Sequence, residues 1–305
     1  MVQFTEVVRR KPTTESFREI KQEVEEALSP KSNFDLNANS SGKTLVTKGD
    51  FGYIEPCYNY QGNYHNYINL ILFSLIPLQT INFSLEVKER AVLVNDLGGS
   101  SLSINGSSKK TLILDLDETL IHADFAGLFK DHDHIIKFQF NNEAVEVPIF
   151  LRPGIFEFLN IVSLYFEVGV FTASLKEYAD SVLNFIDPNN SIFKFRLYRD
   201  SCINVNNGKI FIKDLNILKN RKLENIVIVD NSLYSFANQL ANGVLITSYY
   251  NDKNDKELIN IATYLFQYIL NSSDVRFVNE NFFRFSAMLD ETLMNYNQSN
   301  IGSTN

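Results

Sequence analysis

The sequence contains few of the features that mark secreted proteins. Its 305 residues include only two cysteines, Cys57 and Cys202. A chain of this length can build a core without a disulfide framework, so we expect both residues to be reduced thiols in a reducing compartment. We therefore expect a nuclear or cytoplasmic protein.

The sequence also lacks an excess of positive charge and a long hydrophobic run. The formal net charge is -8, whereas binding to a phosphate backbone depends on clustered Lys and Arg, so we expect no direct nucleic acid binding. The most apolar window, residues 68–81, is short for a membrane span and contains Asn69 and Pro77. The first residues contain no apolar signal core. We therefore expect no membrane association.

The chain is rich enough in apolar residues to fold: 45% are hydrophobic and 13% aromatic. We divide it into an N-terminal extension (residues 1–109), a domain (110–295) and a flexible tail (296–305). In the extension, helical spacing of apolar residues predicts an amphipathic helix over residues 14–28, followed by polar linkers. Residues 51–94 are more apolar and aromatic, but no chemistry can be assigned to them. The extension is predicted to be partly flexible.

The pattern of the second segment predicts a doubly wound α/β fold with a parallel sheet. Residues 111–114, 168–171 and 226–229 are β-rich apolar runs, typical of strands buried on both faces. Helical patterns occur at residues 156–164, 176–186 and 256–270. Such sheets bind their ligands beyond the carboxyl ends of the strands.

Two hairpins are predicted within this domain. Residues 134–140 and 145–151 flank Asn141-Asn142, which indicates a small β-hairpin insertion. A second hairpin is expected around Asn206-Asn207-Gly208. Neither is long enough to form a large lid.

The most informative run is Leu112-Ile113-Leu114-Asp115-Leu116-Asp117-Glu118-Thr119-Leu120. Its apolar start predicts a strand that delivers Asp115 and Asp117 to the edge of the sheet where sites form. A carboxylate at this position can attack phosphorus if a divalent cation offsets the repulsion between the two anions. Asp115, the backbone carbonyl of Asp117 and a later oxygen donor suit Mg²⁺. The alternative reading is a pair of acids capping a turn.

Asp117 is placed to act as an acid and a base. It lies two residues after Asp115, so a local turn of the backbone can direct it toward the leaving oxygen. Two neighbouring carboxylates titrate as a coupled pair. Metal binding to Asp115 would keep that group anionic and leave the proton on Asp117.

The segment from Asp115 to Leu120 resembles the signature of the haloacid-dehalogenase superfamily, in particular its small phosphatases acting on the C-terminal domain of RNA polymerase II. The resemblance covers roughly residues 110–270 and excludes the extension. Further matching motifs are Leu151-Arg152-Pro153-Gly154, Val170-Phe171-Thr172-Ala173-Ser174, Tyr178-Ala179-Asp180, Tyr198-Arg199-Asp200-Ser201-Cys202, Ile212-Lys213-Asp214-Leu215 and Ile228-Val229-Asp230-Asn231-Ser232.

The resemblance implies roles for four later residues. Thr172 would hydrogen-bond the transferring phosphoryl group, and Lys213 would neutralise charge on its oxygens. Asn231 would bind Mg²⁺ through its side chain, while Asp230 would position Lys213 and the water shell of the metal. Taken singly, Thr172 could be a helix cap, Lys213 a solvated lysine and Asp230-Asn231 a turn.

The resemblance also implies a protein substrate. The polymerase-directed relatives accept a proline near the phosphoserine in an aromatic pocket, and Phe125, Leu175 and Tyr178 occupy matching positions. Arg199 could contact the phosphate or a neighbouring acidic group. The expected substrate is thus a phosphorylated protein or peptide, with the polymerase C-terminal domain as one candidate. His122, His132 and His134 are expected to be surface or hairpin residues.

The resulting hypothesis is a magnesium-dependent serine/threonine phosphatase that forms an aspartyl phosphate on Asp115. Two alternatives stay open. The chain could be a catalytically inactive interaction protein that keeps a phosphatase fold, or it could be a small-molecule phosphatase.

Overall fold

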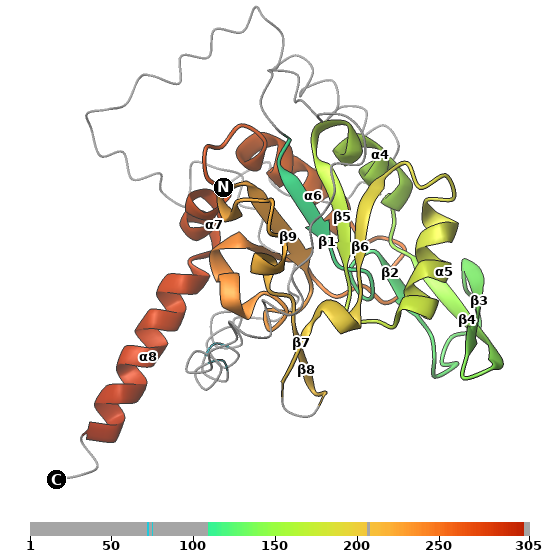
Figure 1. Ribbon diagram of the computed structural model, residues 1–305, viewed down its shortest axis with the longest axis horizontal. Coiled ribbons are helices and arrows are strands. Elements are labelled where there is room, and N and C mark those ends of the chain that lie inside the picture. The colour runs from blue at the N-terminus through green and yellow to red at the C-terminus, as the bar shows by residue number, and fades with distance from the viewer. Residues whose placement is uncertain (1–71, 73–74, 76–108, 206–207, 302–305) are drawn as a thin grey trace, which may run out of the picture.

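The computed structural model describes residues 72, 75, 109–205 and 208–301, and its centre is a parallel sheet (Figure 1). Five strands follow the order β10-β9-β1-β5-β6, and each pairs in parallel with its neighbours. Their bounds are β1 Thr111–Leu114, β5 Glu167–Phe171, β6 Phe193–Leu197, β9 Ile226–Asp230 and β10 Gly243–Leu245. The three strands predicted from apolar runs are the three central ones, and the doubly wound α/β class is confirmed.

Helices follow the strands as the alternating pattern predicts. The helices are α4 Ile155–Tyr165, α5 Lys176–Ile186, α6 Glu257–Tyr264, α7 Val275–Phe283 and α8 Phe285–Ile301. A π-helical segment, Leu265–Ile269, continues α6. Short 3₁₀ turns are η2 Arg199–Ser201, η3 Leu215–Ile217, η4 Leu223–Asn225 and η5 Ala237–Asn242. The predicted helices at residues 156–164 and 176–186 are confirmed, the second with the same bounds.

The central strands bury apolar side chains on both faces of the sheet. Leu112 and Leu114 of β1 belong to one buried cluster, which we call the helical-face cluster because α4, α5 and α6 also contribute to it. Ile113 and Ile228 point to the opposite side and belong to a second cluster, here called the lower-face cluster. Successive side chains on a strand alternate between faces, so uninterrupted apolar runs were required to fill both.

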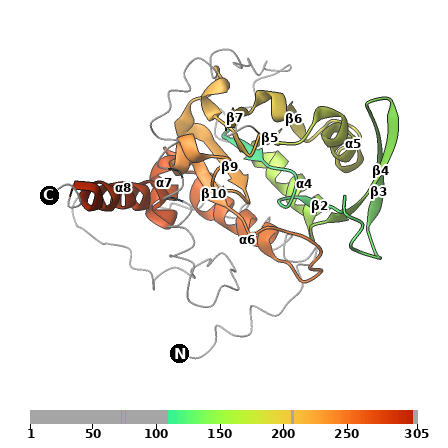
Figure 2. The same cartoon turned by 90° about the horizontal axis from the view of Figure 1, so that it is seen from below.

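The hairpin insertion is a three-stranded antiparallel sheet in the order β2-β4-β3. Its strands are β2 Ile121–Ala123, β3 His134–Phe140 and β4 Glu143–Leu151. The two residues at its tip, Asn141 and Asn142, have φ of 50° and 65°, as a type I′ turn requires. This confirms the predicted hairpin. Figure 2 shows β3 and β4 extending from the side of the domain opposite α8.

The second predicted hairpin is formed by β7 Ile203–Val205 and β8 Ile210–Ile212, which pair antiparallel. Gly208, just before β8, has a φ of 83°, a conformation that a residue with a Cβ rarely adopts. Residues 206 and 207, at the tip, lie outside the described residues. The hairpin matters for the site because β8 leads directly into Lys213.

Two observations differ from the predicted division of the chain. The helix α8 continues through Ile301, so helical structure enters the segment expected to be a flexible tail from residue 296. Leu72 and Leu75, from the predicted extension, are fully buried in the lower-face cluster. The helix predicted at residues 14–28 lies outside the described residues.

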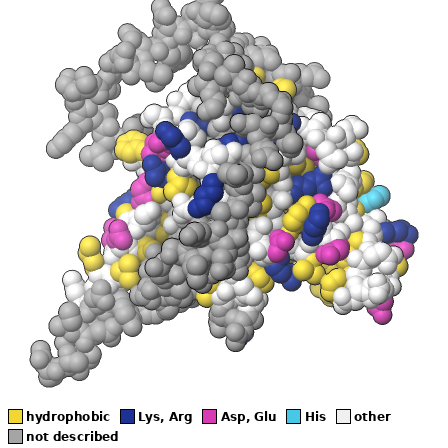
Figure 3. All heavy atoms as spheres, viewed as in Figure 1, with side chains coloured by type: hydrophobic (Ala, Val, Ile, Leu, Met, Phe, Trp, Pro, Cys, Tyr) yellow, Lys and Arg dark blue, Asp and Glu magenta, His cyan; other side chains and the backbone are white. Residues whose placement is uncertain are grey.

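The surface of the described part carries both signs of charge. Figure 3 shows Lys and Arg side chains interspersed with Asp and Glu on the visible face. Within the described ranges, no helix is both long and apolar enough to cross a bilayer.

Arg152 is the largest fully buried side chain and ties three segments together. Its Nε and Nη2 donate to both carboxylate oxygens of Asp255, each at 2.8 Å. Its Nη1 donates to the carbonyl of Thr119 at 3.0 Å, and Nη2 also donates to the carbonyl of Thr247 at 2.7 Å. The Leu-Arg-Pro-Gly motif thus holds the loop after Asp117 against the loop before α6.

We expect Arg152→Ala to lower the free energy of unfolding by about 3–5 kcal/mol, because it leaves the Asp255 carboxylate without its partner. Urea unfolding measures this loss. The control is Lys137→Ala, since Lys137 pairs with Glu146 at 2.6 Å between side chains that are 69% and 57% exposed. Exposed pairs contribute less than about 1 kcal/mol. Equal losses in the two variants would contradict this assignment.

Candidate active site

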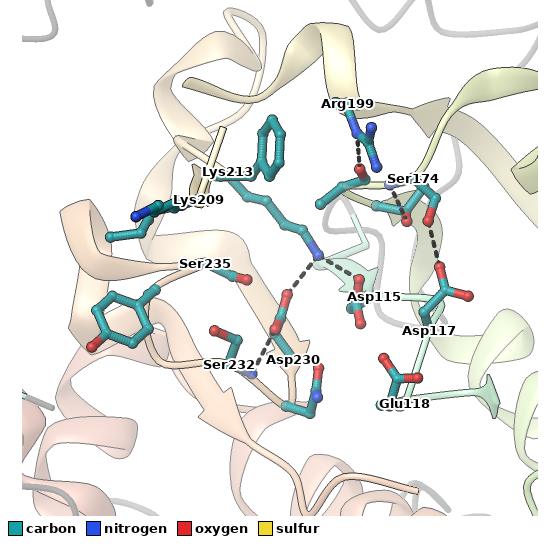
Figure 4. A pocket seen from close by; sticks show the side chains of 16 residues that line it. Asp115, Asp117, Glu118, Ser174, Arg199, Lys209, Lys213, Asp230, Ser232 and Ser235 are labelled. Atoms are coloured by element: carbon teal, nitrogen blue, oxygen red, sulfur yellow. Dashed lines mark hydrogen bonds and ion pairs between the residues drawn. The ribbon is translucent and has the colours of Figure 1, made fainter. Parts of the chain in front are cut away.

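The carboxyl ends of the three central strands bring the predicted residues together. Asp115 directly follows β1, Thr172 directly follows β5, and Asp230 is the last residue of β9. These strands are neighbours, so the three side chains meet at one edge of the sheet. Figure 4 shows Asp115 and Asp230 side by side there. The backbone N–H of Asp115 donates to the carbonyl of Val229 at 3.0 Å, which fixes the first residue beyond β1 against β9.

Lys213 reaches the same edge from outside the parallel sheet. It follows β8, and its backbone N–H donates to the carbonyl of Ser235 at 2.7 Å. Its side chain is buried, and Nζ lies 2.5 Å from Oδ1 of Asp115 and 2.6 Å from Oδ2 of Asp230. Lys213 is therefore an ammonium group held between two carboxylates and not the solvated lysine of the alternative reading.

The side chains of Asp115 and Lys213 are both buried, and burial affects the pKa of each group. Burial raises the pKa of Asp115 to about 7, an effect that Lys213 opposes and the neighbouring Asp230 strengthens. Burial alone would lower the pKa of Lys213, but the two carboxylates outweigh it and raise that pKa above its usual value. Lys213 is thus a fixed positive charge, while Asp115 depends on nearby cations to stay ionised.

Asp117 is held by two hydroxyl groups. Ser174 Oγ donates to Oδ2 at 2.6 Å, and Tyr178 Oη donates to Oδ1 at 2.5 Å. Burial raises the pKa of Asp117, and these two hydrogen bonds oppose the rise. A hydroxyl can donate or accept by rotating, so Asp117 can keep partners in both its protonated and its ionised state. This suits a group that both gives and takes a proton.

A cavity of about 660 Å³ opens over these side chains. Its lining includes the residues predicted to react or to bind metal: Asp115, Asp117, Thr172, Lys213, Asp230 and Asn231. It also includes Arg199, whose Nε donates to the carbonyl of Ala173 at 2.6 Å and whose guanidinium lies 5.1 Å from the centre of the Phe211 ring. The predicted constellation therefore shares one cavity.

The oxygen donors at the cavity floor fit a hard cation. Oδ1 of Asp115 is engaged by Lys213, which leaves Oδ2 as the oxygen for a metal. The Nδ2 of Asn231 donates to Ser248 Oγ at 3.0 Å, so its Oδ1 is the free end of the amide. Carboxylate, amide and backbone carbonyl oxygens are the ligands that Mg²⁺ prefers. In the described part of the chain, no group of three or more His, Cys, Asp or Glu side chains is arranged to hold a metal.

Both carboxylate oxygens of Asp230 and of Asp117 accept hydrogen bonds. Both oxygens of Asp230 accept hydrogen bonds, Oδ2 from Lys213 and Oδ1 from the backbone N–H of Ser232 at 2.8 Å. Asp117 is occupied by its two hydroxyl partners. Asp115 and Asn231 thus offer side-chain oxygens for a metal and Asp230 positions Lys213, while the metal roles of Asp117 and Asp230 stay predictions.

The residues predicted to bind the substrate divide into two places. Arg199 lines the cavity, whereas Phe125, Leu175 and Tyr178 do not. The ring of Phe125 is 64% exposed and its centre lies 5.3 Å from that of buried Tyr178. Leu175 is 37% exposed at the N-cap of α5. Phe125 is the exposed ring of this pair, whereas the hydroxyl of Tyr178 contacts Asp117.

Several lining residues were not predicted as site residues. Ser174 was given no role of its own within its motif, although its hydroxyl contacts Asp117. Lys209 and Phe211 line the cavity together with Lys213. Ile210 lines the cavity as well, so no alternation of faces along β8 marks these residues in the sequence. Glu118 also lines the cavity. Its Oε1 lies 2.9 Å from His122 Nδ1, and the direction of this hydrogen bond depends on the tautomer of the histidine ring.

Comparison with known proteins identifies the family of this chain. The model of the family described as NLI interacting factor-like phosphatase matches residues 110–276, more than half of the chain. The chain belongs to this family. The match spans β1 to the first residues of α7 and thus contains every residue of the cavity floor, and it starts where the resemblance in sequence starts.

Several proteins similar to this chain carry phosphatase names. CTD small phosphatase-like protein 2 of Dictyostelium discoideum is 46% identical over 172 residues, which cover 56% of this chain and 29% of that protein. Phosphatase PSR1 of Saccharomyces cerevisiae is 38% identical over 157 residues, 52% of this chain and 36% of that protein. The chain spans about a third to a half of the length of the first such relatives.

One relative is covered more fully. CTD nuclear envelope phosphatase 1B of Danio rerio is 34% identical over 169 residues, 53% of this chain and 68% of that protein. Among solved structures, a fission yeast RNA polymerase II CTD phosphatase bound to beryllium fluoride gives a TM-score of 0.39 at 19% identity, over 64% of this chain and 66% of that one. This overlap is too low to support an inference about the site.

Proposed function

We propose that this chain is a magnesium-dependent protein serine/threonine phosphatase that acts through an aspartyl phosphate on Asp115. The observation that carries the proposal is the meeting of Asp115, Asp117 and Lys213 in one cavity at the carboxyl ends of the central strands. Membership of a phosphatase family supports it.

In the first half of the reaction, the Asp115 carboxylate attacks phosphorus and displaces the seryl or threonyl oxygen. Asp117 gives its proton to that oxygen, so the leaving group departs as a neutral hydroxyl. Lys213 and the Thr172 hydroxyl hold phosphoryl oxygens, which favours the transition state in which charge builds up on them. Thr172 Oγ1 is oriented by the backbone N–H of Ser174, which donates to it at 3.0 Å.

In the second half, water attacks the phosphorus of the aspartyl phosphate. Asp117 now takes a proton from that water, which restores its starting state, and Asp115 leaves as a carboxylate next to Lys213. Water is therefore the final acceptor. A bound Mg²⁺ would neutralise negative charge on the phosphoryl oxygens and on Asp115 throughout.

Removal of divalent cations with a chelator is expected to abolish phosphate release, and added Mg²⁺ is expected to restore it. Because Asn231 offers a metal-binding oxygen, Asn231→Ala should raise the Mg²⁺ concentration for half-maximal activity by at least about tenfold. Titration of activity with Mg²⁺ measures both effects. The control is Ser232→Ala, which keeps the backbone N–H that binds Asp230. Full activity of the chelated protein would contradict the metal assignment.

A phosphoprotein substrate fits the shape of the site better than a small metabolite does. The insertion after β1 is a small sheet and leaves the cavity accessible to a peptide loop. The exposed ring of Phe125, packed on Tyr178, offers an apolar surface for a residue near the phosphoserine. Several relatives carry CTD phosphatase names. We propose a phosphorylated peptide segment as the substrate, with the RNA polymerase II C-terminal domain as one candidate.

Phosphate release from phosphoserine and phosphothreonine peptides, with and without a following proline, compared with release from sugar phosphates, tests this function. We expect kcat/KM to be highest for peptides. A preference for sugar phosphates would favour a small-molecule phosphatase. No release from either class in the presence of Mg²⁺ would favour an inactive interaction protein. Asp115→Asn serves as the background control in every assay.

A further inference from the structure

The two faces of the central sheet are covered in different ways. Long helices α4, α5 and α6 pack on the helical-face cluster. The described residues that cover the lower-face cluster come instead from the β7–β8 hairpin, the short turns η3 and η5, and the first turns of α8. From α8, these are Phe285, Met288 and Leu289. A parallel sheet needs both faces covered, so this side depends on small elements.

Leu72 and Leu75 belong to this lower-face cluster. Both have helical backbone, and both side chains are 0% exposed. Residues three apart on a helix lie on the same face, so the two leucines enter the core together. Leu75 lies 34 residues before Lys109 in the sequence, and Leu72 lies further upstream.

The cluster that receives these leucines lies directly behind the cavity. It contains Phe171, which precedes Thr172, and Ile212, which precedes Lys213. It also contains Cys202 and Leu197, on either side of η2, which carries Arg199. Side chains on this face therefore support the backbone of three residues that line the cavity.

We propose that the lower face of the sheet is an intramolecular docking surface for the segment that carries Leu72 and Leu75. The folding unit of the domain then includes Leu72 and Leu75, although the family match begins at residue 110. Docking of this segment also holds β8, and with it Lys213, against the sheet.

Thermal unfolding of the full-length chain tests the docking. Leu72→Ala and Leu75→Ala each remove a fully buried side chain, and such changes lower the midpoint of a domain of this size by roughly 5–15 °C. Leu75→Met keeps the volume and is expected to stay close to the unsubstituted protein. The matched control is Leu164→Ala, because Leu164 is 51% exposed and its loss should change little. Midpoints of both docking variants within the range of the control would overturn the proposal.

Hydrogen exchange then distinguishes docking from local folding of the extension. In the Leu72→Ala/Leu75→Ala double variant, amides of residues 210–218 and 285–289 are expected to exchange faster, because these segments line the docking surface. Faster exchange confined to residues near 72 and 75 would mean that the segment folds without the sheet, and would overturn the proposal. Neither measurement depends on phosphatase activity, so the test stands apart from that of the proposed function.

Discussion

The Asp115→Asn variant is expected to lose phosphatase turnover by at least about four orders of magnitude, as removal of a catalytic nucleophile does. The amide that replaces the carboxylate has the same shape, and it can still accept a hydrogen bond from Lys213. It is, however, a poor nucleophile and cannot carry the phosphoryl group as an acyl phosphate. Steady-state phosphate release from a phosphoserine peptide measures the loss.

A control is needed because Asp115 is buried and paired. Circular dichroism and the thermal midpoint should show that Asp115→Asn keeps the fold, since the strand β1 and its pairing are unchanged. A matched variant is Asp200→Asn, which also neutralises one aspartate but lies at an exposed position in η2. Near-normal turnover of pure Asp115→Asn would refute its role as the nucleophile.

Lys213→Ala is expected to lower kcat by roughly 10²–10³-fold with a smaller change in KM. The reason is that the Lys213 ammonium lies 2.5 Å from the attacking carboxylate in a buried site, where a fixed charge stabilises the transition state far more than it would in water. Rates measured over a range of peptide concentrations separate the two parameters. A loss confined to KM would contradict a role in the transition state.

The control for Lys213 is another lysine of the same cavity. Lys209 is exposed and also lines the cavity, so Lys209→Ala removes the same charge from the same opening without disturbing Asp115 or Asp230. We expect a change of only a few-fold. An equal loss in both variants would indicate that the number of positive charges in the cavity matters, and that the position of Lys213 does not.

The sheet and the reactive side chains could be predicted because they depend on local patterns. The runs at Leu112–Leu114 and Ile226–Val229 can only be buried on both faces, and each is followed by acids that such strands deliver to one edge. The family resemblance added Thr172 and Lys213, which no local pattern distinguishes from a cap or a surface lysine. Their positions in the cavity are as predicted.

Contacts between distant segments could not be predicted in the same way. The hydroxyls of Ser174 and Tyr178 reach Asp117 across 57 and 61 residues, and nothing in the sequence selects them from other hydroxyls. The burial of Leu72 and Leu75 depends on an apolar face that exists only when the sheet is assembled. The helical continuation of α8 to Ile301 extends a weakly amphipathic, polar segment that resembled a tail in sequence.

The most direct test is to trap the phosphorylated enzyme. The protein is mixed with a phosphoserine peptide and Mg²⁺, the reaction is quenched in acid during turnover, and the modified residue is located by mass spectrometry of the digested chain. We predict one hydroxylamine-sensitive phosphoryl group, on Asp115, that disappears when the peptide is exhausted. A phosphoryl group on another residue, or full turnover while Asp115 stays unmodified, would contradict the account.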